Sequence, residues 1–529
     1  MYKNVILWFC LLYFIGNCES AKILAMFSAA SHSHKVIFRP YINGLMARGH
    51  EVVIVTADLD YPNGGGPEKL KEIGIHDIAY NSVRDGMLNM RTGRGESLYT
   101  HFSQMFGMIN KQGYNLYNSE VMKNLLKDQS FDLILVEAFH EALLAIAHLL
   151  KRPVIKVSSL GSINNYEVIG APIHPLLYPE IVTQRMQDLS LLEEIKEVAN
   201  YLGLQYISYD SENKFNEFFQ QKYPGLPTIR ELQKNVNALL LNTNPMWEEN
   251  RPVPIGVAYT LGLMNKKGVG LSEDLKKYLD SSENGVIYVS FGTNVFPSRL
   301  PVDRIQILMK VLSEVPYSIL LKWDKDDIQG LPKNLKIVNW CPQLDVLKHP
   351  KVKLFITQGG LHSTEEAINA GVPLIGIPII FDQFNNAEKY ERHGIGKKIE
   401  IETMTEHELR DAIETIMGDD SYHRNVLQFR KLMYDTPQDP VQRAVWLTEY
   451  ILRHGDVRHL RSPAADLTWA EYIELELLLI IFFTILIFII IIIAGIVSLI
   501  NSCRRNKASD TNVNLGAPYK VTPAYRNFT

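Results

Sequence analysis

Cysteine is scarce in this chain, which has only four in 529 residues. Cys10 and Cys18 lie in an apolar N-terminal segment, and Cys503 follows a long apolar run near the other end. Cys341 is therefore the only cysteine between the two apolar segments, and no disulfide can form within that part. We expect its fold to depend on an ordinary packed core.

The chain also lacks an excess of positive charge. Its formal net charge is −4, whereas a general nucleic-acid binder needs a concentrated basic face. The sequence shows no internal repeat at a fixed period. Its length exceeds the roughly 250–300 residues at which single cores stop growing, so we expect two or three folding units.

The N-terminal segment has the pattern of a secretory signal peptide. Lys3 precedes the apolar run Val5–Ile15, and small or polar residues follow up to Ser20. Because the run is too short to span a bilayer, we predict that residues 1–20 are a signal peptide cleaved after Ser20.

The second apolar segment, Leu477–Ile500, contains no charged residue and is long enough to cross ~30 Å of hydrocarbon. Glutamates precede it, whereas Arg504, Arg505 and Lys507 follow it. The positive-inside rule therefore predicts a type I protein, with residues 21–476 in a lumenal or external compartment and a cytosolic tail at 501–529.

After the signal peptide, the sequence predicts a βαβ unit. Apolar runs indicate strands at Lys22–Ser28 and Glu51–Thr56, with a helix at about Lys35–Arg48 between them. His34 lies where the first strand meets the helix, which is a position for a catalytic group that faces a cleft. An imidazole suits proton transfer near neutral pH. We interpret the neighbouring His32 as a loop or supporting residue.

The most informative stretch is Val338–Asn386, which has the strand–helix–strand pattern of another α/β unit. Its polar residues gather where strands end and helices begin, and ligands bind at those ends of an open α/β sheet. Gly359 and Gly360 allow the backbone to come close to a ligand. The N-terminus of the helix that follows suits a diphosphate.

Three motifs in this stretch carry a family resemblance: W-C-P-Q at its start, T-Q-G-G-x-x-S-x-x-E at its centre and D-Q at its end. Together they resemble the donor-binding signature of the UDP-glycosyltransferases, especially the membrane-bound animal type and its insect members. The likeness extends more weakly from Ala21 to the C-terminus. It implies an α/β protein of the GT-B architecture, with two facing Rossmann-like domains and one C-terminal transmembrane helix.

The expected boundaries follow from this resemblance and from the composition. The acceptor-binding domain is predicted at 21–243, a proline-containing linker at 244–262 and the UDP-sugar-binding domain at 263–455. The transmembrane helix is predicted at 477–500. The helix Pro440–Arg453 is expected to pack back onto the first domain.

The resemblance assigns the donor contacts to the second domain. Trp340 would stack on the uracil, Gln343 would bond the nucleoside, and Glu366 would accept hydrogen bonds from the ribose. Asp382 and Gln383 would bond the transferred sugar. The other expected donor contacts are Thr293, Gln358, Gly359, Gly360 and Ser363.

Several of these positions leave alternatives open. Gln358 stands where the family usually has His, so an N–H donor is kept but a cationic form is lost. Ser290 faces the same crevice as Thr293, which is the preferred contact. His362 is either a polar contact beside the glycines or a solvated loop histidine.

The resemblance gives His34 the role of catalytic base, because relatives carry a histidine at the same spacing before an R-G-H triplet. Here that triplet ends at His50, which we interpret as structural. The partner of the base is usually an aspartate at a strand end, but the strand Phe131–Glu137 ends in the longer glutamate. We favour Glu137 over Glu141 as this partner, and an ordinary role at a helix N-terminus stays open for both.

Residues 59–129 are predicted to be irregular. Two amphipathic helices are predicted around Pro179–Leu202 and Glu212–Lys222. These segments are candidates for an acceptor pocket or for contact with a bilayer surface, and ordinary core helices are an equal alternative.

The resemblance implies an inverting transferase that moves a hexose from a UDP-sugar to a hydroxyl of a small lipophilic acceptor, as in detoxification. UDP-glucose is favoured as donor over UDP-glucuronate. No permanently bound cofactor and no metal are expected, and Asp324, Asp326 and Asp327 are interpreted as a solvated loop. The family likeness alone implies the endoplasmic reticulum membrane, and it leaves a homodimer open.

Two alternative functions stay open at this point. One is an enzyme of the same fold that modifies an endogenous membrane lipid. The other is a nucleotide-sugar-binding pseudoenzyme, which the departures at Gln358 and Glu137 keep open.

Overall fold

The computed structural model divides into two units, Met1–Ala465 and Asp466–Thr529. The predicted signal peptide up to residue 19 and the tail beyond residue 513 lie outside the described residues. The described residues are 20–89, 98–161, 166–183, 188–261, 268–293, 295–324, 332–455 and 457–513.

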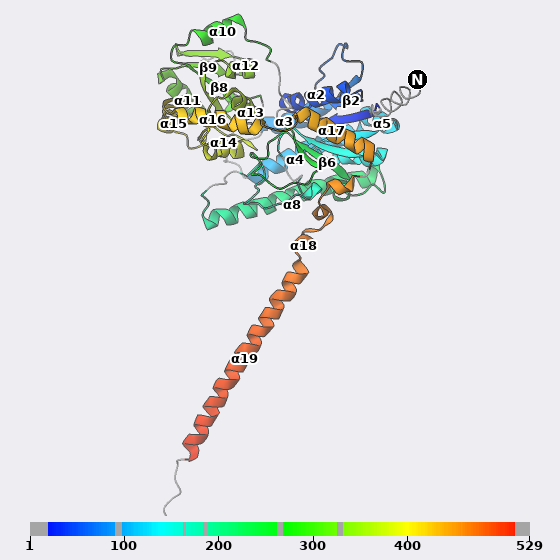
Figure 1. The fold of residues 1–529 in the computed structure, drawn as a ribbon, viewed down its shortest axis with the longest axis vertical. Coiled ribbons are helices and arrows are strands. Elements are labelled where there is room, and N and C mark those ends of the chain that lie inside the picture. Colours follow the sequence, from blue (N-terminus) through cyan, green and yellow to red (C-terminus); the bar gives the residue numbers. More distant parts are fainter. Residues whose placement is uncertain are drawn as a thin grey trace, which may run out of the picture. The chain divides into compact units, whose positions relative to one another are not determined.

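The first unit contains two parallel sheets (Figure 1). The earlier one has seven strands in the order β3-β2-β1-β4-β5-β6-β7. These strands are mostly buried apolar runs, as expected for parallel strands covered on both faces. Their bounds are β1 Lys22–Phe27, β2 Glu51–Thr56, β3 Leu70–Gly74, β4 Leu133–Glu137, β5 Val154–Ser158, β6 Val236–Leu241 and β7 Val257–Tyr259.

Helices cover both faces of this sheet. One face packs against α2 (His32–Ala47) and α17 (Pro440–His454). Figure 1 shows α17, in orange, lying among the blue and cyan elements of the first half. The expected return of this helix to the first domain is therefore confirmed. The other face is covered by α4 Leu98–Asn118, α5 Glu120–Lys127, α6 Leu144–Leu150, α8 Leu191–Lys222 and α9 Ile229–Gln233.

The second sheet has six parallel strands in the order β10-β9-β8-β11-β12-β13. Their bounds are β8 Val286–Ser290, β9 Ser318–Lys322, β10 Leu335–Val338, β11 Val352–Thr357, β12 Leu374–Gly376 and β13 Gly396–Lys398. The helices around it are α10 Glu273–Asp280, α11 Val302–Glu314, α12 Gln343–Leu347, α13 Leu361–Ala370, α14 Gln383–Arg392, α15 Glu406–Gly418 and α16 Asp420–Tyr434.

Each sheet reverses its strand order at one point, between β1 and β4 and between β8 and β11. In doubly wound sheets ligands bind beyond the carboxyl ends of the strands at such a switch point. His34 and Glu137 follow the strands at the first switch point. Gln358 and Gly359 follow β11 at the second. The topology thus places both groups of predicted site residues where this fold binds ligands.

Two expectations about local structure were wrong. Residues 59–129 are not irregular, since they include β3, α3 (His76–Asn89), α4 and α5. Two separate helices were predicted between Pro179 and Lys222, but the structure has one continuous helix, α8, from Leu191 to Lys222. A capping box at Ser190 fixes its N-terminus.

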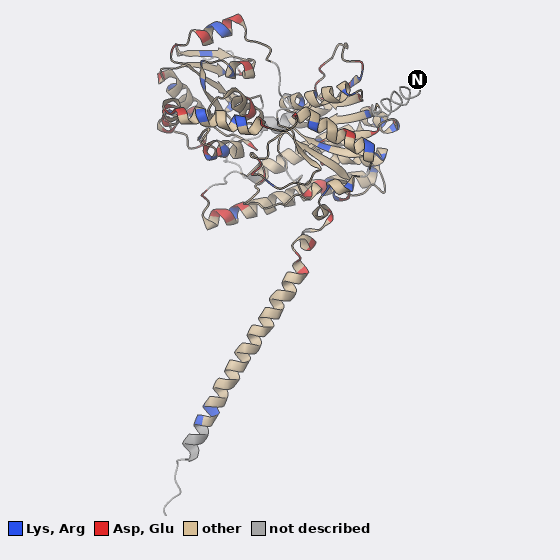
Figure 2. Ribbon diagram, viewed as in Figure 1, with Lys and Arg blue, Asp and Glu red and all other residues tan. Residues whose placement is uncertain are grey.

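The described part of the second unit is dominated by α19, Leu475–Val513. Its segment Leu475–Lys507 has a mean hydropathy of 3.6 in its most apolar window and is long and apolar enough to cross a membrane. The ribbon in Figure 2 is coloured as uncharged along most of this helix, with acidic colour at its start and basic colour toward its described end. The predicted span at 477–500 lies within this helix.

Candidate active site

A cavity of about 330 Å³ opens between the carboxyl ends of the two sheets. Residues of both halves of the first unit line it. Those from the first half include Ser33 and His34, at the start of α2, and Leu160, after β5. Of the residues predicted to contact the donor, it is lined by Thr293, Trp340, Gln343, Gln358, Gly360, Ser363, Glu366, Asp382 and Gln383.

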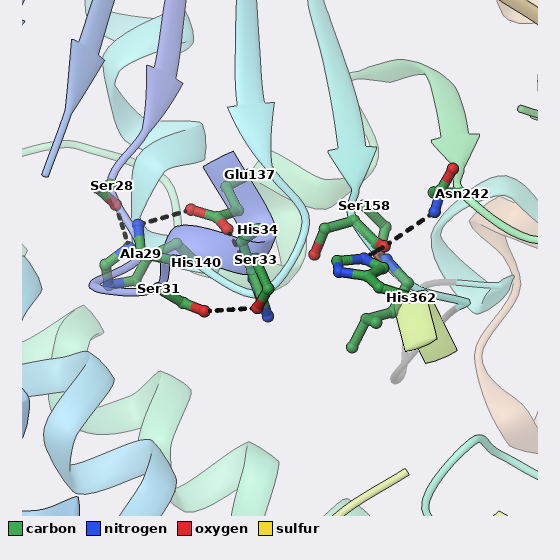
Figure 3. A network of polar contacts seen from close by, with 12 residues as sticks. Ser28, Ala29, Ser31, Ser33, His34, Glu137, His140, Ser158, Asn242 and His362 are labelled. Carbon is green, nitrogen blue, oxygen red and sulfur yellow. Dashed lines mark hydrogen bonds and ion pairs between the residues drawn. The ribbon is translucent and has the colours of Figure 1, made fainter. Parts of the chain in front are cut away.

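His34 forms a hydrogen bond to Glu137 at the end of β4 (Figure 3). The distance from Nδ1 of His34 to Oε1 of Glu137 is 3.2 Å. The other carboxylate oxygen of Glu137 accepts a hydrogen bond from the backbone N–H of Ala29 at 2.8 Å. The Glu137 side chain is only 2% exposed, whereas His34 is 21% exposed. One buried carboxylate is thus fixed beneath an imidazole that reaches the cavity.

Glu141, the alternative partner, lies elsewhere. Its carboxylate pairs with the fully buried Lys156 and accepts a hydrogen bond from Gln233 at 3.1 Å. The geometry therefore joins His34 to Glu137 and gives Glu141 a structural ion pair.

A second histidine near Glu137, His140, was missed in the sequence. Its Nδ1 lies 2.8 Å from the hydroxyl of Ser28, and its Nε2 lies 3.0 Å from the carbonyl of Ile109. The carbonyl can only accept, so Nε2 carries the proton and Nδ1 accepts from Ser28. Burial lowers the pKa of His140. This neutral imidazole fixes the loop beyond β1 from which α2 begins, and only its place three residues after Glu137 could have indicated it.

The two glycines after β11 form the other side of the cavity. Gly359 has a φ of +88°, a conformation that other residues rarely adopt. Gly360 is the N-cap of α13. The Oε1 of Gln358 accepts a hydrogen bond from Thr357 at 2.9 Å, and a Cβ on Gly360 would lie 3.0 Å from its Nε2. An amide donor and a helix N-terminus therefore meet at one point, which suits an anion.

Gln343, Ser363 and Glu366 form one hydrogen-bonded group. The Nε2 of Gln343 donates to Glu366 at 2.7 Å and to Ser363 at 3.0 Å. Its Oε1 accepts from Tyr288, a residue the sequence reasoning did not select, at 3.2 Å. Trp340 is 69% exposed at the same cavity. A planar exposed ring beside a fixed carboxylate can bind a nucleoside by stacking and by hydrogen bonds to hydroxyls.

Asp382 and Gln383 begin α14 at the edge of the cavity. Burial raises the pKa of Asp382 to about 6, although Asn386 donates to its carboxylate at 2.8 Å. The Oε1 of Gln383 accepts from the backbone N–H groups of Ile379 and Ile380. Since that oxygen is occupied, the Nε2 of Gln383 is the group that it can offer to a sugar hydroxyl.

Lys322, at the end of β9, is another lining residue that the sequence reasoning missed. Its Nζ donates to the carbonyl of Gly292 at 3.0 Å, and burial lowers its pKa. A lysine at the carboxyl end of an apolar strand is the signal that could have found it. Thr293 is exposed at the cavity, whereas Ser290 is buried and accepts from the N–H of Gly292.

His362 is not a solvated loop histidine. It lies in the first turn of α13, and its Nε2 is 2.9 Å from the carbonyl of Ser159 in the first half (Figure 3). Its ring centroid lies 6.5 Å from that of His34. His50 is buried and accepts from the N–H of Ala21, as expected of a structural residue. The side chain of His32 lies outside the described residues.

No cluster of three or more His, Cys, Asp or Glu side chains that could hold a metal ion occurs in the described part of the chain. Asp324 accepts hydrogen bonds from Ser298. Asp326 and Asp327 lie outside the described residues. The expectation of metal-free catalysis stays a prediction.

Two facing parallel sheets with a cavity between their carboxyl ends form the GT-B fold. Solved structures agree with this fold. The UDP-glucose:anthocyanidin 3-O-glucosyltransferase in complex with UDP aligns with a TM-score of 0.59 at 18% identity, covering 82% of this chain and 99% of that one. A glycosyltransferase of kitacinnamycin aligns with a TM-score of 0.57 at 18% identity, covering 82% and 98%.

Sequence comparisons define the family. Residues 21–509 match the model of the UDP-glucuronosyl and UDP-glucosyl transferases. An ecdysteroid UDP-glucosyltransferase of Spodoptera littoralis nuclear polyhedrosis virus is 32% identical, covering 88% of this chain and 95% of its own. A UDP-glycosyltransferase of the insect Dactylopius coccus is 29% identical, covering 88% and 93%. The chain belongs to the UDP-glycosyltransferase family and is an enzyme that transfers sugar from a UDP-sugar.

Proposed function

We propose that the enzyme is an inverting hexosyltransferase in which His34 deprotonates a hydroxyl of a small lipophilic acceptor. The observation that carries this proposal is the His34–Glu137 pair, which reaches the same cavity as the donor motif. A base on one domain and a donor site on the other is what in-line transfer across a cleft requires.

The hydrogen bond to Glu137 sets the tautomer of the base. With Nδ1–H donating to the carboxylate, the Nε2 of His34 has a lone pair that can take the acceptor proton. The deprotonated oxygen attacks the anomeric carbon on the face opposite the diphosphate, and UDP leaves with the electrons of the broken bond. Glu137 stabilises the imidazolium that forms. General-base catalysis of this kind contributes about 10²–10⁴-fold in rate.

On the donor side, each residue is proposed in the role that its geometry supports. Trp340 stacks on the uracil, while Gln343 and Glu366 bond the nucleoside. The N-terminus of α13, with Gly359, Gly360 and Ser363, and the amide of Gln358 receive the diphosphate. Asp382 and Gln383 orient the sugar, and Thr293 completes the contacts.

Glucose is the proposed sugar and glucuronate the second candidate. The viral relatives are named as ecdysteroid glucosyltransferases, which supports a glucosyl donor and a lipophilic hydroxyl compound as acceptor. A relative from Macaca fascicularis, 27% identical, is named as a glucuronosyltransferase. We propose a type I membrane protein because of the apolar helix α19 and the basic residues at its end. Its location in the endoplasmic reticulum membrane is proposed from the family likeness alone.

The test is UDP release by microsomes that contain the full chain or His34→Ala. They receive UDP-glucose or UDP-glucuronate, a panel of phenols and steroids, and EDTA. We expect EDTA-resistant turnover with UDP-glucose that falls about 10²–10⁴-fold in His34→Ala. Equal turnover by the two proteins would refute the role of His34. Donor binding without turnover on any acceptor would refute the transferase activity in favour of a pseudoenzyme.

A further inference from the structure

A second cavity, of about 510 Å³, lies at the opposite end of the first sheet from the active site. It is lined by the end of α6, by the amino ends of β5 and β6, and by residues that follow α17. Val154 begins β5 at this cavity, whereas Ser158 ends the same strand toward the active site. The two cavities are therefore separated by the length of the strand.

Five cationic residues line this cavity, which we call the basic pocket: Lys151, Arg152, Lys234, Arg458 and Arg461. Among its described lining residues there is no aspartate or glutamate. Like charges gathered in one concave site repel one another, and field lines concentrate there, so that an anion is attracted.

Two of the arginines are held by backbone carbonyls. Arg152 donates from Nη2 to the carbonyl of Gln129 at 2.9 Å. Arg461 donates from Nη2 to the carbonyl of Val168 at 3.0 Å and from Nη1 to that of Lys234. These bonds fix the orientation of the two guanidinium groups. The Nε of Arg152 is buried and has no hydrogen-bond partner among the described residues.

We propose that the basic pocket binds the phosphate group of an anionic ligand. Guanidinium and ammonium donors that converge on one point match phosphate oxygens in charge and geometry. Such a phosphate has two possible sources, the headgroup of an anionic phospholipid and a soluble phosphate compound.

The position of the pocket along the chain favours the lipid source. Arg458 and Arg461 stand in the segment that leads from α17 to Ala465, where the first unit ends. The apolar helix begins at Leu475. Residues 466–474 extend to at most about 30 Å, so a bilayer that α19 crosses lies within that reach of Ala465. A headgroup bound in the pocket would limit the orientation of the catalytic domains above the membrane.

The experiment uses the full chain in zwitterionic detergent micelles, with and without saturating UDP, so that binding at the active site is distinguished from binding at the basic pocket. Native mass spectrometry and thermal unfolding are recorded with phosphatidic acid, with phosphatidylcholine and with inorganic phosphate. The variant is Lys151→Glu with Lys234→Glu, which are two exposed residues. The matched control is Lys276→Glu with Lys277→Glu, two exposed residues of α10 with the same change of charge.

We expect phosphatidic acid to remain bound and to raise the melting temperature of the wild type and of the control, and phosphatidylcholine to do neither. In the Lys151/Lys234 variant, binding should weaken about tenfold or more. Turnover should be unchanged, because neither lysine touches the cavity of the active site. An equal effect of inorganic phosphate would support the pocket and identify a soluble ligand.

The proposal is overturned if neither phosphate source binds, or if binding is the same in the variant and in the control. Should the charge-reversed variant fail to fold, Lys151→Gln with Lys234→Gln removes the same charges without adding new ones. Unchanged binding in that neutral variant would refute the proposal equally.

Discussion

At the scale of single residues, Glu137 and Glu141 are two carboxylates four positions apart that meet different partners. Glu137 ends β4 and bonds His34, whereas Glu141 begins the next turn and pairs with Lys156 on β5. This difference allows a matched test of the catalytic pair, since the same substitution can be made at both positions.

We expect Glu137→Gln to lower kcat about 10²–10³-fold, because the imidazolium of His34 loses its counter-charge. Glu137→Asp should retain less than about a tenth of the activity, since the shorter side chain no longer reaches Nδ1 at 3.2 Å. The measurement is kcat with UDP-glucose at saturating acceptor.

Glu141→Gln is the control for this prediction. It should leave kcat within about twofold and lower the melting temperature, because Lys156 is fully buried and would lose its charged partner. A loss of kcat at Glu141 equal to that at Glu137 would contradict the assignment of the pair.

Asp382 leads to a prediction about pH. Burial raises the pKa of this carboxyl to about 6, so the folded state holds a proton that the unfolded state releases near pH 4. The free energy of unfolding therefore falls as the pH rises from about 4 through 6. Above that range the carboxylate is ionised in both states, and the destabilisation by its burial no longer changes with pH. In the role proposed for Asp382, the ionised carboxylate is the form that accepts hydrogen bonds from the sugar hydroxyls.

Asp382→Asn should accordingly be more stable than the wild type at pH 8, by roughly 1–2 kcal/mol, and equal to it at pH 4. Its KM for UDP-glucose should rise, and the increase of wild-type KM below about pH 6 should disappear. Denaturant unfolding at the two pH values and donor kinetics from pH 5 to 8 measure both effects. If Asp382→Asn were less stable than the wild type at pH 8, the neighbours of Asp382 would stabilise its ionised carboxylate in the folded state.

At the scale of elements, the start of α13 supports a test of diphosphate binding. Gly360 has a φ of −63°, which alanine adopts without strain, but the added Cβ would lie 3.0 Å from the amide of Gln358. Gly360→Ala should fold normally and raise the KM for UDP-glucose about tenfold, because it fills the space next to the helix N-terminus.

Gly359→Ala is the comparison, and it should fail in a different way. At a φ of +88°, with its Cβ 2.9 Å from the carbonyl of Gln383, it should lose at least 1 kcal/mol of stability. Thermal unfolding with and without UDP separates the two outcomes. If Gly360→Ala left the KM unchanged, the diphosphate would not approach this helix end.

How much the sequence predicted also differed between elements. Strands such as β1, β2 and β11 were found because buried parallel strands are continuous apolar runs. The edge strand β3, with the sequence LKEIG, was missed. Only two of its five residues are aliphatic, and its two charged residues give no sign of a strand. The length of α8 was also missed, because its polar and apolar residues are not separated into two faces at the helical period.

Whether a site residue could be predicted also depended on whether it belongs to a local sequence pattern. Gln343 and Glu366 could be singled out because they belong to recognisable motifs, and the structure joins them by a hydrogen bond that was not predicted. Tyr288 carried no such signal, and Lys322 and His140 carried only a weak one, because the positions of all three depend on how separate strands are aligned in the sheets. Packing between distant segments, rather than local pattern, places these side chains.

At the scale of the whole molecule, the end of the chain stabilises its beginning. The helix α17 follows the second sheet in sequence but buries Val445, Leu447 and Ile451 against the face of the first sheet. Its Thr448 hydrogen-bonds Tyr41, and its Glu449 pairs with Arg48 at 2.8 Å. Burial of one such aliphatic side chain is worth about 1.5–3 kcal/mol.

This dependence predicts different outcomes for two truncations. A chain that ends at Ala465 keeps α17 and lacks α18 (Trp469–Tyr472), α19 and the tail, so it should fold, bind UDP and remain in solution after high-speed centrifugation. A chain that ends at Asp439 exposes the apolar face of α2. It loses a contribution comparable with the total stability of about 5–15 kcal/mol of a typical domain.

We therefore expect the shorter chain to lack a cooperative thermal transition, whereas the longer one should melt close to the full-length protein. Circular dichroism melting and UDP titration of both chains measure this difference. If the chain ending at Asp439 melted cooperatively and bound UDP as tightly as the chain ending at Ala465, the two halves would be independent of α17. In that case direct contacts between the two halves, such as the hydrogen bond from His362 to Ser159, would hold the cleft closed. His362→Ala in the shorter chain would then abolish turnover and leave the affinity for UDP unchanged.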